Sequence, residues 1–182
     1  MKSKISTLPA AVALAVLLTG SPLHAAEEPA VSLSDLQATA RSLGFLDTLR
    51  RDGTIVIGIV YASPANRAPA AQVADRLRAI PGPNASELRP ELIAAADLPQ
   101  FPGRLDAVFL MPGVPAAETG MAESVRRRRI VSISNDPTCL DTRCCVLLIR
   151  TTRGVEIFLD TALADAVGAR FSSVFSMMVK RK

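Results

Sequence analysis

Three nearly continuous apolar runs form the strongest pattern along the chain, at residues 54–61, 105–111 and 130–134. Runs rich in β-branched residues and without polar alternation are typical of strands covered on both faces, as in parallel sheets. Residues 87–94 form a weaker candidate strand. Because Pro90 has no N–H to donate to a ladder, this strand is expected at a sheet edge.

Helical periodicity separates these runs. Apolar residues fall close to one face after Ser34, the expected N-cap of a helix that weakens or ends at Gly44. Two further helices are predicted over residues 70–80 and 115–127. This alternation of strand, loop and helix is the arrangement of α/β domains.

The C-terminal third has a different pattern. Residues 145–150 and 155–160 are two apolar runs joined by a short turn, which predicts a β-hairpin. A short helix capped by Asp160 or Thr161 and ending at Gly168 is expected next. The chain therefore predicts a single-domain α/β sandwich, in which a mixed, mostly parallel β-sheet is flanked by helices and carries a C-terminal β-hairpin.

A last helix is expected near the C-terminus, capped by Ser172 or Ser173. It contains Met177 and Met178. Because methionine readily fills irregular gaps in protein cores, these two side chains are interpreted as core packing.

The first residues have the composition of a secretory signal peptide. Lys2 and Lys4 precede a nine-residue apolar run, 10–18, and small residues follow at Ala25 and Ala26. Such a run is too short to cross a bilayer core of about 30 Å. We therefore expect a cleaved signal peptide at 1–26, a leader at 27–33, a single domain at 34–182 and a periplasmic location.

Loss of the signal peptide would remove His24, the chain's single histidine. Ser-His and Cys-His catalysis and the common metal sites of enzymes need an imidazole, and no pair of carboxylates stands at a spacing suited to acid-base work. No enzymatic activity, cofactor or metal is therefore expected. The 21 basic residues fall to 19 without Lys2 and Lys4, against 17 acidic ones. Together with the scarcity of aromatic residues, this balance argues against nucleic-acid binding.

The loop after the first apolar run is a candidate ligand site. Open α/β sheets bind ligands beyond the carboxyl ends of their strands, and Arg67 is suited to hold a carboxylate or a phosphate. Ser63 and Asn66 belong to the same loop. An ordinary turn capped by Asn66 is the simpler interpretation.

Four consecutive arginines, Arg126, Arg127, Arg128 and Arg129, form the densest charge run. At the end of a helix, cations interact favourably with the helix dipole and the exposed carbonyls, which suffices to explain them. A contact with a partner or an anionic surface is the alternative.

All three cysteines, Cys139, Cys144 and Cys145, lie within seven positions. Their spacing departs from the C-x2-C pattern of redox and zinc sites. In an exported protein a disulfide is expected, joining Cys139 to either Cys144 or Cys145, since a bond between neighbouring cysteines needs a distorted peptide unit. Neighbouring strand residues point to opposite faces, so the remaining cysteine should be buried and reduced.

Residues 130–178 resemble the end of the YfiR-like family of periplasmic regulatory proteins. A strand with a Ser-Asp-type turn leads to a loop that carries cysteine and then to a hairpin, where VEIFLD (155–160) stands in place of the family's F-E-I-N-like strand. An alanine-rich helix, Gly168 and the segment FSSVFSMM (171–178) complete the match. Asp160 replaces the family's Asn, and Arg143 and Cys144 stand where Gly-Gly is usual.

The resemblance implies an exported regulator without enzymatic activity. Members of the family restrain a membrane-bound diguanylate cyclase, and hence cyclic-di-GMP signalling, by binding its periplasmic domain. Redox-sensitive disulfides and homodimers are common among them, and a Cys139–Cys145 bond would be this chain's version. The alternative hypothesis is a small periplasmic solute-binding module, which would use Ser63 to Arg67 and the strand ends near Pro112.

Overall fold

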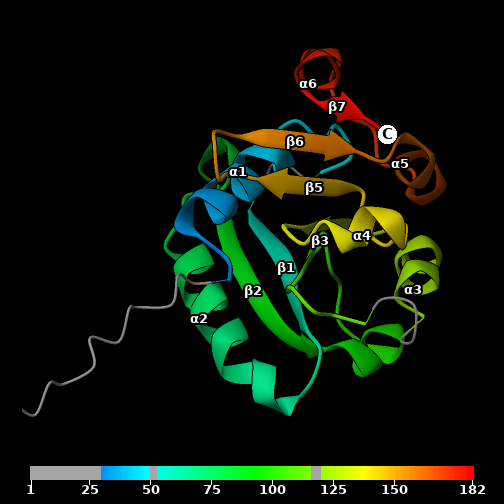
Figure 1. Cartoon of the computed structure of the whole chain (residues 1–182). Helices are drawn as coiled ribbons and strands as arrows, with labels where there is room; N and C mark the ends of the chain where they lie inside the picture. Colours follow the sequence, from blue (N-terminus) through cyan, green and yellow to red (C-terminus); the bar gives the residue numbers. More distant parts are fainter. Residues whose placement is uncertain (1–29, 50–52, 116–119) are drawn as a thin grey trace, which may run out of the picture.

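The computed structural model describes residues 30–49, 53–115 and 120–182, and Figure 1 shows them as a sheet covered by helices. Within these residues the sheet has seven strands in the order β2-β1-β3-β4-β5-β6-β7. The strands are β1 (Thr54–Tyr61), β2 (Glu87–Ala94), β3 (Ala107–Leu110), β4 (Val131–Ser134), β5 (Leu147–Arg150), β6 (Glu156–Leu159) and β7 (Lys180–Arg181).

The first five strands run parallel to their neighbours, and β6 turns back antiparallel to β5. The predicted α/β fold with a mostly parallel sheet is therefore confirmed. The order β2-β1-β3-β4-β5 is that of doubly wound folds, whose ligands usually lie beyond the carboxyl ends of the strands. The run 54–61 forms β1 at its predicted bounds, and the Pro90 strand β2 lies at the sheet edge as expected.

Helices cover both faces of the sheet. The α-helices are α1 (Leu33–Leu43), α2 (Arg67–Arg78), α3 (Met121–Arg128), α4 (Thr138–Asp141), α5 (Thr161–Val167) and α6 (Ser173–Met178), and the 3-10 helices are η1 (Pro64–Asn66), η2 (Pro83–Ala85) and η3 (Ala95–Gln100). Helix α1 contacts α2, whereas α3 contacts α5 and η3. Right-handed crossovers account for this division, because β1-α2-β2 and β3-α3-β4 advance in opposite directions along the sheet.

Helix α1 begins earlier than the Ser34 cap predicts. Its N-cap is Ser32, whose side chain accepts from the Asp35 N–H while the Asp35 carboxylate accepts from the Ser32 N–H. This capping box satisfies two N–H groups that a cap at Ser34 would leave free. Val31 is also buried, so the ordered domain includes the end of the predicted leader. The predicted signal peptide and residues 27–29 lie outside the described residues.

Two other helix boundaries also differ from the prediction. Helix α2 starts at Arg67 rather than at residue 70, because the 3-10 turn η1 runs directly into it. Helix α3 is described from Met121 to Arg128, and residues 116–119 of the predicted helix lie outside the described part.

The C-terminal third follows the predicted order. Strands β5 and β6 form an antiparallel hairpin, Asp160 caps α5, which ends at Gly168, and Ser172 caps α6. Strand β7 was not predicted: Lys180 and Arg181 are polar and exposed, and only their pairing with β6 makes them a strand.

The interpretation of Met177 and Met178 as core residues is wrong. Their exposed fractions are 78% and 61%, whereas Phe175 is buried at 1%. Helix α6 is short and packs through Phe175, which stacks between Phe45 and Phe171 at centroid distances of 5.1 and 5.0 Å. Helix α6 is therefore held by this ring, and its two methionines remain exposed.

Within the described residues, no helix combines the length and apolar character needed to span a bilayer.

Candidate functional site: a cysteine-lined pocket beyond β3 and β4

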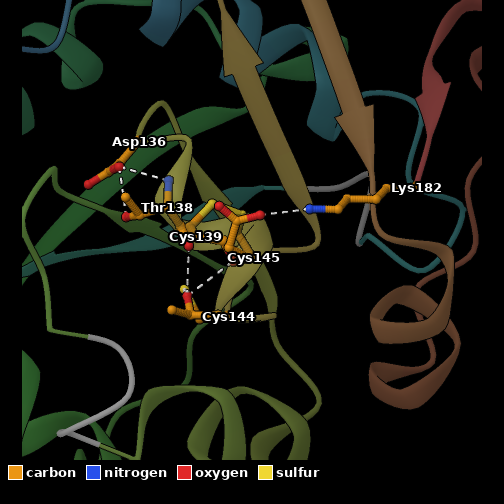
Figure 2. Close-up of polar contacts among 8 residues, drawn as sticks. Asp136, Thr138, Cys139, Cys144, Cys145 and Lys182 are labelled. Atoms are coloured by element: carbon orange, nitrogen blue, oxygen red, sulfur yellow. Dashed lines mark hydrogen bonds and ion pairs between the residues drawn. A yellow bond between two sulfur atoms is a disulfide. The ribbon is translucent and has the colours of Figure 1, made fainter.

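A disulfide joins Cys139 in α4 to Cys145, two residues before β5, with the Cα atoms 5.5 Å apart (Figure 2). This is the pairing that the family resemblance implied. Cys144 is free and buried, as expected for the third cysteine. The bond fixes the short segment between α4 and the start of the hairpin.

Local hydrogen bonds bring the two bonded cysteines together. The Asp136 carboxylate accepts from the N–H (3.0 Å) and hydroxyl (2.8 Å) of Thr138, the first residue of α4, and so closes the turn that leads into this helix (Figure 2). At the other end, the Cys144 N–H donates to the Cys139 carbonyl at 3.0 Å. Arg143 adopts a left-handed conformation with φ 49°, which reverses the chain directly before Cys144 and Cys145.

A cavity of about 210 Å³ opens beside this turn. It lies beyond the carboxyl ends of β3 and β4, where parallel α/β sheets usually place their ligands. Both the free Cys144 and the disulfide-bonded Cys139 belong to its lining. The lining residues are Leu110, Met111, Val114, Pro115, Ser134, Asp136, Thr138, Cys139, Thr142 and Cys144.

Asp136 is the only acidic residue among these lining residues. Burial raises the pKa of its carboxyl group, but hydrogen bonds from the Gly113 N–H and from Thr138 outweigh burial and hold the pKa below its ordinary value. The carboxylate is therefore ionised near neutral pH and poorly suited to act as a base there. Its geometry indicates a structural clamp between α4 and the loop after β3.

The pKa of Cys144 is shifted in the opposite direction. Burial raises the pKa of its thiol, and the hydroxyl of Thr142, 3.4 Å from Sγ, offsets only part of the increase. A thiol that stays protonated is a weak nucleophile and a weak metal ligand. Nor do the described residues contain a group of three His, Cys, Asp or Glu side chains arranged to hold a metal ion.

The predicted loop site lies apart from this pocket. The Ser63 hydroxyl donates to Asn66 Oδ1 at 2.8 Å, within the turn that leads to α2. Arg67 is exposed at the first position of α2. None of the three lines the cavity, because they follow β1, whereas the cavity lies at β3 and β4. The predicted strand ends near Pro112 do border the cavity, since Leu110, Met111, Val114 and Pro115 are among its lining residues.

The arginine run divides into different roles. Arg128 donates to the carbonyls of Phe101 (2.8 Å) and Gly103 (3.0 Å), so it holds the loop between η3 and β3. Arg129 is the C-cap of α3 in a left-handed conformation, with φ 53°. Arg126 and Arg127 are exposed in the last turn of α3, where they suit the helix dipole.

Sequence reasoning did not identify the pocket residues Ser134 and Asp136. A signal was present, since the polar sequence SND directly follows the apolar residues of β4. Polar residues at the carboxyl end of a parallel strand are the usual position for a site in this class of fold. Which strand end is hollow depends on the loops that pack around it, and the sequence pattern does not specify this.

Comparison with known proteins identifies the fold alone. No protein-family model matches the chain, and no curated protein matches it. The crystal structure of a conserved domain protein from Vibrio cholerae O1 biovar eltor aligns with a TM-score of 0.60 and 11% sequence identity. The alignment covers 81% of this chain and 60% of that one, so the chain spans somewhat more than half the length of that protein. The chain is therefore similar in fold to the Vibrio protein.

Proposed function

We propose that this chain is an exported, non-enzymatic regulatory protein of the YfiR-like type. It would restrain a membrane-bound signalling protein, such as a diguanylate cyclase, by binding its periplasmic domain. The observation that carries the proposal is the disulfide Cys139–Cys145, which stands between β4 and the β5–β6 hairpin. This is the place where the resembling family carries its cysteine-containing loop.

The charge distribution is compatible with a protein partner. The chain has a nearly balanced charge once Lys2 and Lys4 are set aside, which suits recognition of a specific surface better than general attraction to a polyanion. Its pocket is small and offers no strong base or nucleophile at neutral pH, because the described Asp136 and Cys144 have pKa values shifted away from that range.

The proposal is tested by deleting the gene and measuring cellular cyclic-di-GMP. We expect the level to rise several-fold, on the order of tenfold at most for a single released cyclase. The exported chain should restore the original level, and a version lacking residues 1–26 should not. A deletion and an overexpression that both leave cyclic-di-GMP unchanged would contradict the cyclase as target.

A second candidate function, small-solute binding, is supported by the cavity of about 210 Å³ beyond β3 and β4. A ligand of mixed polarity should raise the unfolding temperature of the purified protein. Val114→Trp would fill the cavity and abolish that shift, whereas Arg89→Ala on the edge strand β2 would leave it unchanged. Screening amino acids and small carboxylic acids without any shift would exclude this alternative for those ligand classes.

A further inference from the structure

A second hollow, distinct from the cysteine-lined pocket, lies between α1, β6 and α6. Its volume is about 320 Å³. Ala38 and Phe45 contribute from the α1 side, Ile157 from β6, and Phe175 and Met178 from α6. Two short helices thus flank a strand, and the space between them is an apolar groove, which we call the α1–α6 groove.

Exposed apolar side chains lie on the elements that border this groove. Among the described residues, five large apolar side chains are exposed: Leu33, Val155, Val174, Met177 and Met178. Val155 and Met178 line the groove itself. Leu33 lies in the first turn of α1, and Val174 and Met177 lie on α6, so all five are on or next to the elements that border the groove. Monomeric proteins rarely leave such side chains in one region unless it contacts a partner. Methionine is well suited to this role because its flexible side chain adapts to different surfaces.

The surroundings of the groove are cationic. Arg41 stands on its α1 wall, Arg153 lies in the turn before Val155, and Arg181 follows α6. In the described part of the chain these three arginines are exposed and have no acidic partner. The nearby carboxylate of Glu156 is already paired with Lys180. The groove therefore presents an apolar floor with Arg41 in its lining, and Arg153 and Arg181 lie on adjoining segments; no described carboxylate forms an ion pair with any of the three.

We propose that the α1–α6 groove binds an acidic amphipathic helix of the membrane-bound partner, an inference that rests on the proposed regulatory function. An apolar groove between helices receives the apolar ridge of a helix, with side chains at i, i+3, i+4 and i+7 as anchors. Carboxylates beside that ridge would meet Arg41, Arg153 and Arg181. A second copy of this chain would bring like charges together, and a flat lipid surface would not reach the floor at Phe175.

The first test uses two synthetic helical peptides of about 16 residues. Both carry leucine at the ridge positions, and the remaining positions hold mainly Glu in one and mainly Lys in the other. Fluorescence anisotropy with the purified chain should show binding of the Glu peptide at least about tenfold tighter than that of the Lys peptide. Equal binding of the two, or binding of neither, would overturn the proposal.

Variants then locate the binding surface. Met178→Glu and Arg41→Glu should each weaken binding of the Glu peptide by about tenfold, because the first places a negative charge on the α6 wall and the second replaces a cation of the α1 wall by an anion. Arg127→Glu is the matched control, since this arginine is exposed on α3, which packs with α5 and η3. A loss of affinity in the control as large as in the groove variants would refute the assignment of the surface.

A photo-crosslinking amino acid at position 178 or at position 127 of the exported full chain separates this inference from the function on which it rests. Crosslinking from 178 to an acidic helical segment of a membrane protein, mapped by mass spectrometry, would support both. A membrane protein captured from 127 alone would overturn the groove and leave the regulatory function intact. Capture of lipid or of a second copy from 178 would overturn the groove, and no membrane protein from either position would overturn both.

Discussion

Cys144 lies next to a disulfide-bonded cysteine and yet remains a free thiol inside the protein, with an exposed fraction of 2%. Burial raises the pKa of this thiol, which lowers the thiolate fraction available for exchange with the neighbouring bond. At the scale of the residue, burial therefore keeps this thiol protonated beside the bonded pair.

The burial of Cys144 predicts that its thiol reacts slowly with reagents and that the stability of the protein depends on pH in a specific way. Native protein should react with a thiol reagent at least about tenfold more slowly than unfolded protein. Because the folded pKa is raised, the thiol contributes stability below its unfolded pKa of about 8.5 that is lost as pH increases toward the folded value. Urea denaturation between pH 7 and 10 measures this loss, and Cys144→Ala should remove it. Complete labelling of native protein within the mixing time would contradict the prediction.

The stability contributed by Asp136 depends on pH in the opposite direction to that of Cys144. Hydrogen bonds from Gly113 and Thr138 lower its pKa despite partial burial, so its stabilising effect is present above its unfolded pKa of about 3.9 and is lost as pH falls through the folded value. Asp136→Ala should cost about 1–2 kcal/mol of unfolding free energy at pH 7, because the hydrogen bonds from Gly113 and Thr138 are lost. The difference from wild type should narrow below about pH 4. A difference that is independent of pH would show that the charge has no part in it.

At the scale of elements, the start of α1 is fastened to the sheet through one carboxylate. Asp35, with an exposed fraction of 6%, accepts from Thr151 Oγ1 at 2.7 Å and from Asn135 Nδ2 at 3.1 Å, in addition to its role in the capping box. It therefore connects α1 to the ends of β4 and β5. The position of the α1 wall of the groove depends on this connection.

Asp35→Ala should lower the unfolding free energy by about 2 kcal/mol, since it removes one half of the capping box and leaves the partly buried donors of Thr151 and Asn135 without this acceptor. Chemical denaturation provides the measurement. Asp75→Ala is the control: Asp75 forms an exposed ion pair with Arg78 on α2, and its loss should cost less than about 0.5 kcal/mol. Equal losses of unfolding free energy in the two variants would mean that the hydrogen bonds around Asp35 contribute no more to stability than an exposed ion pair.

At the scale of the whole molecule, the disulfide adds only modestly to the stability of a fold that rests on a continuous apolar core. Its cysteines are six positions apart, for which the chain-entropy model gives about 2 kcal/mol. Domains of this size are commonly stable by about 5–15 kcal/mol. The bond therefore fixes α4 and the entry to the hairpin and is not expected to decide whether the chain folds.

The double variant Cys139→Ala/Cys145→Ala should accordingly still unfold in one cooperative transition, with a loss of about 2 kcal/mol relative to wild type. Treatment with a reducing agent should lower the stability of wild type and of Cys144→Ala by a similar amount and leave the double variant unaffected. Loss of the cooperative transition in the double variant would show that the sheet depends on the bond.

The α1–α6 groove and the cysteine-lined pocket differ in how far they could be predicted. The expected export and the distorted peptide unit of a bond between neighbouring cysteines leave two pairings for the disulfide, and the resemblance implies the observed one. The solute-binding hypothesis includes the strand ends near Pro112, which border the pocket, but not its wall at α4 and Cys144. The groove was not predicted at all, because it is bordered by segments far apart in the chain, such as Ala38 and Phe175. Met177 and Met178 were assigned to the core because residue type alone does not show which side of a short helix is covered.

The sequence by itself determined the class of fold, because local signals specify it: the β-branched run of β1, the proline that places β2 at an edge, and the caps Asp160 and Ser172. Only the tertiary structure decided which cysteine pairs with Cys139, that Lys180 and Arg181 form a strand, and where hollows remain. Those features depend on the relative positions of distant segments, and the energies that set these positions are summed over the whole core rather than contained in any short stretch of residues.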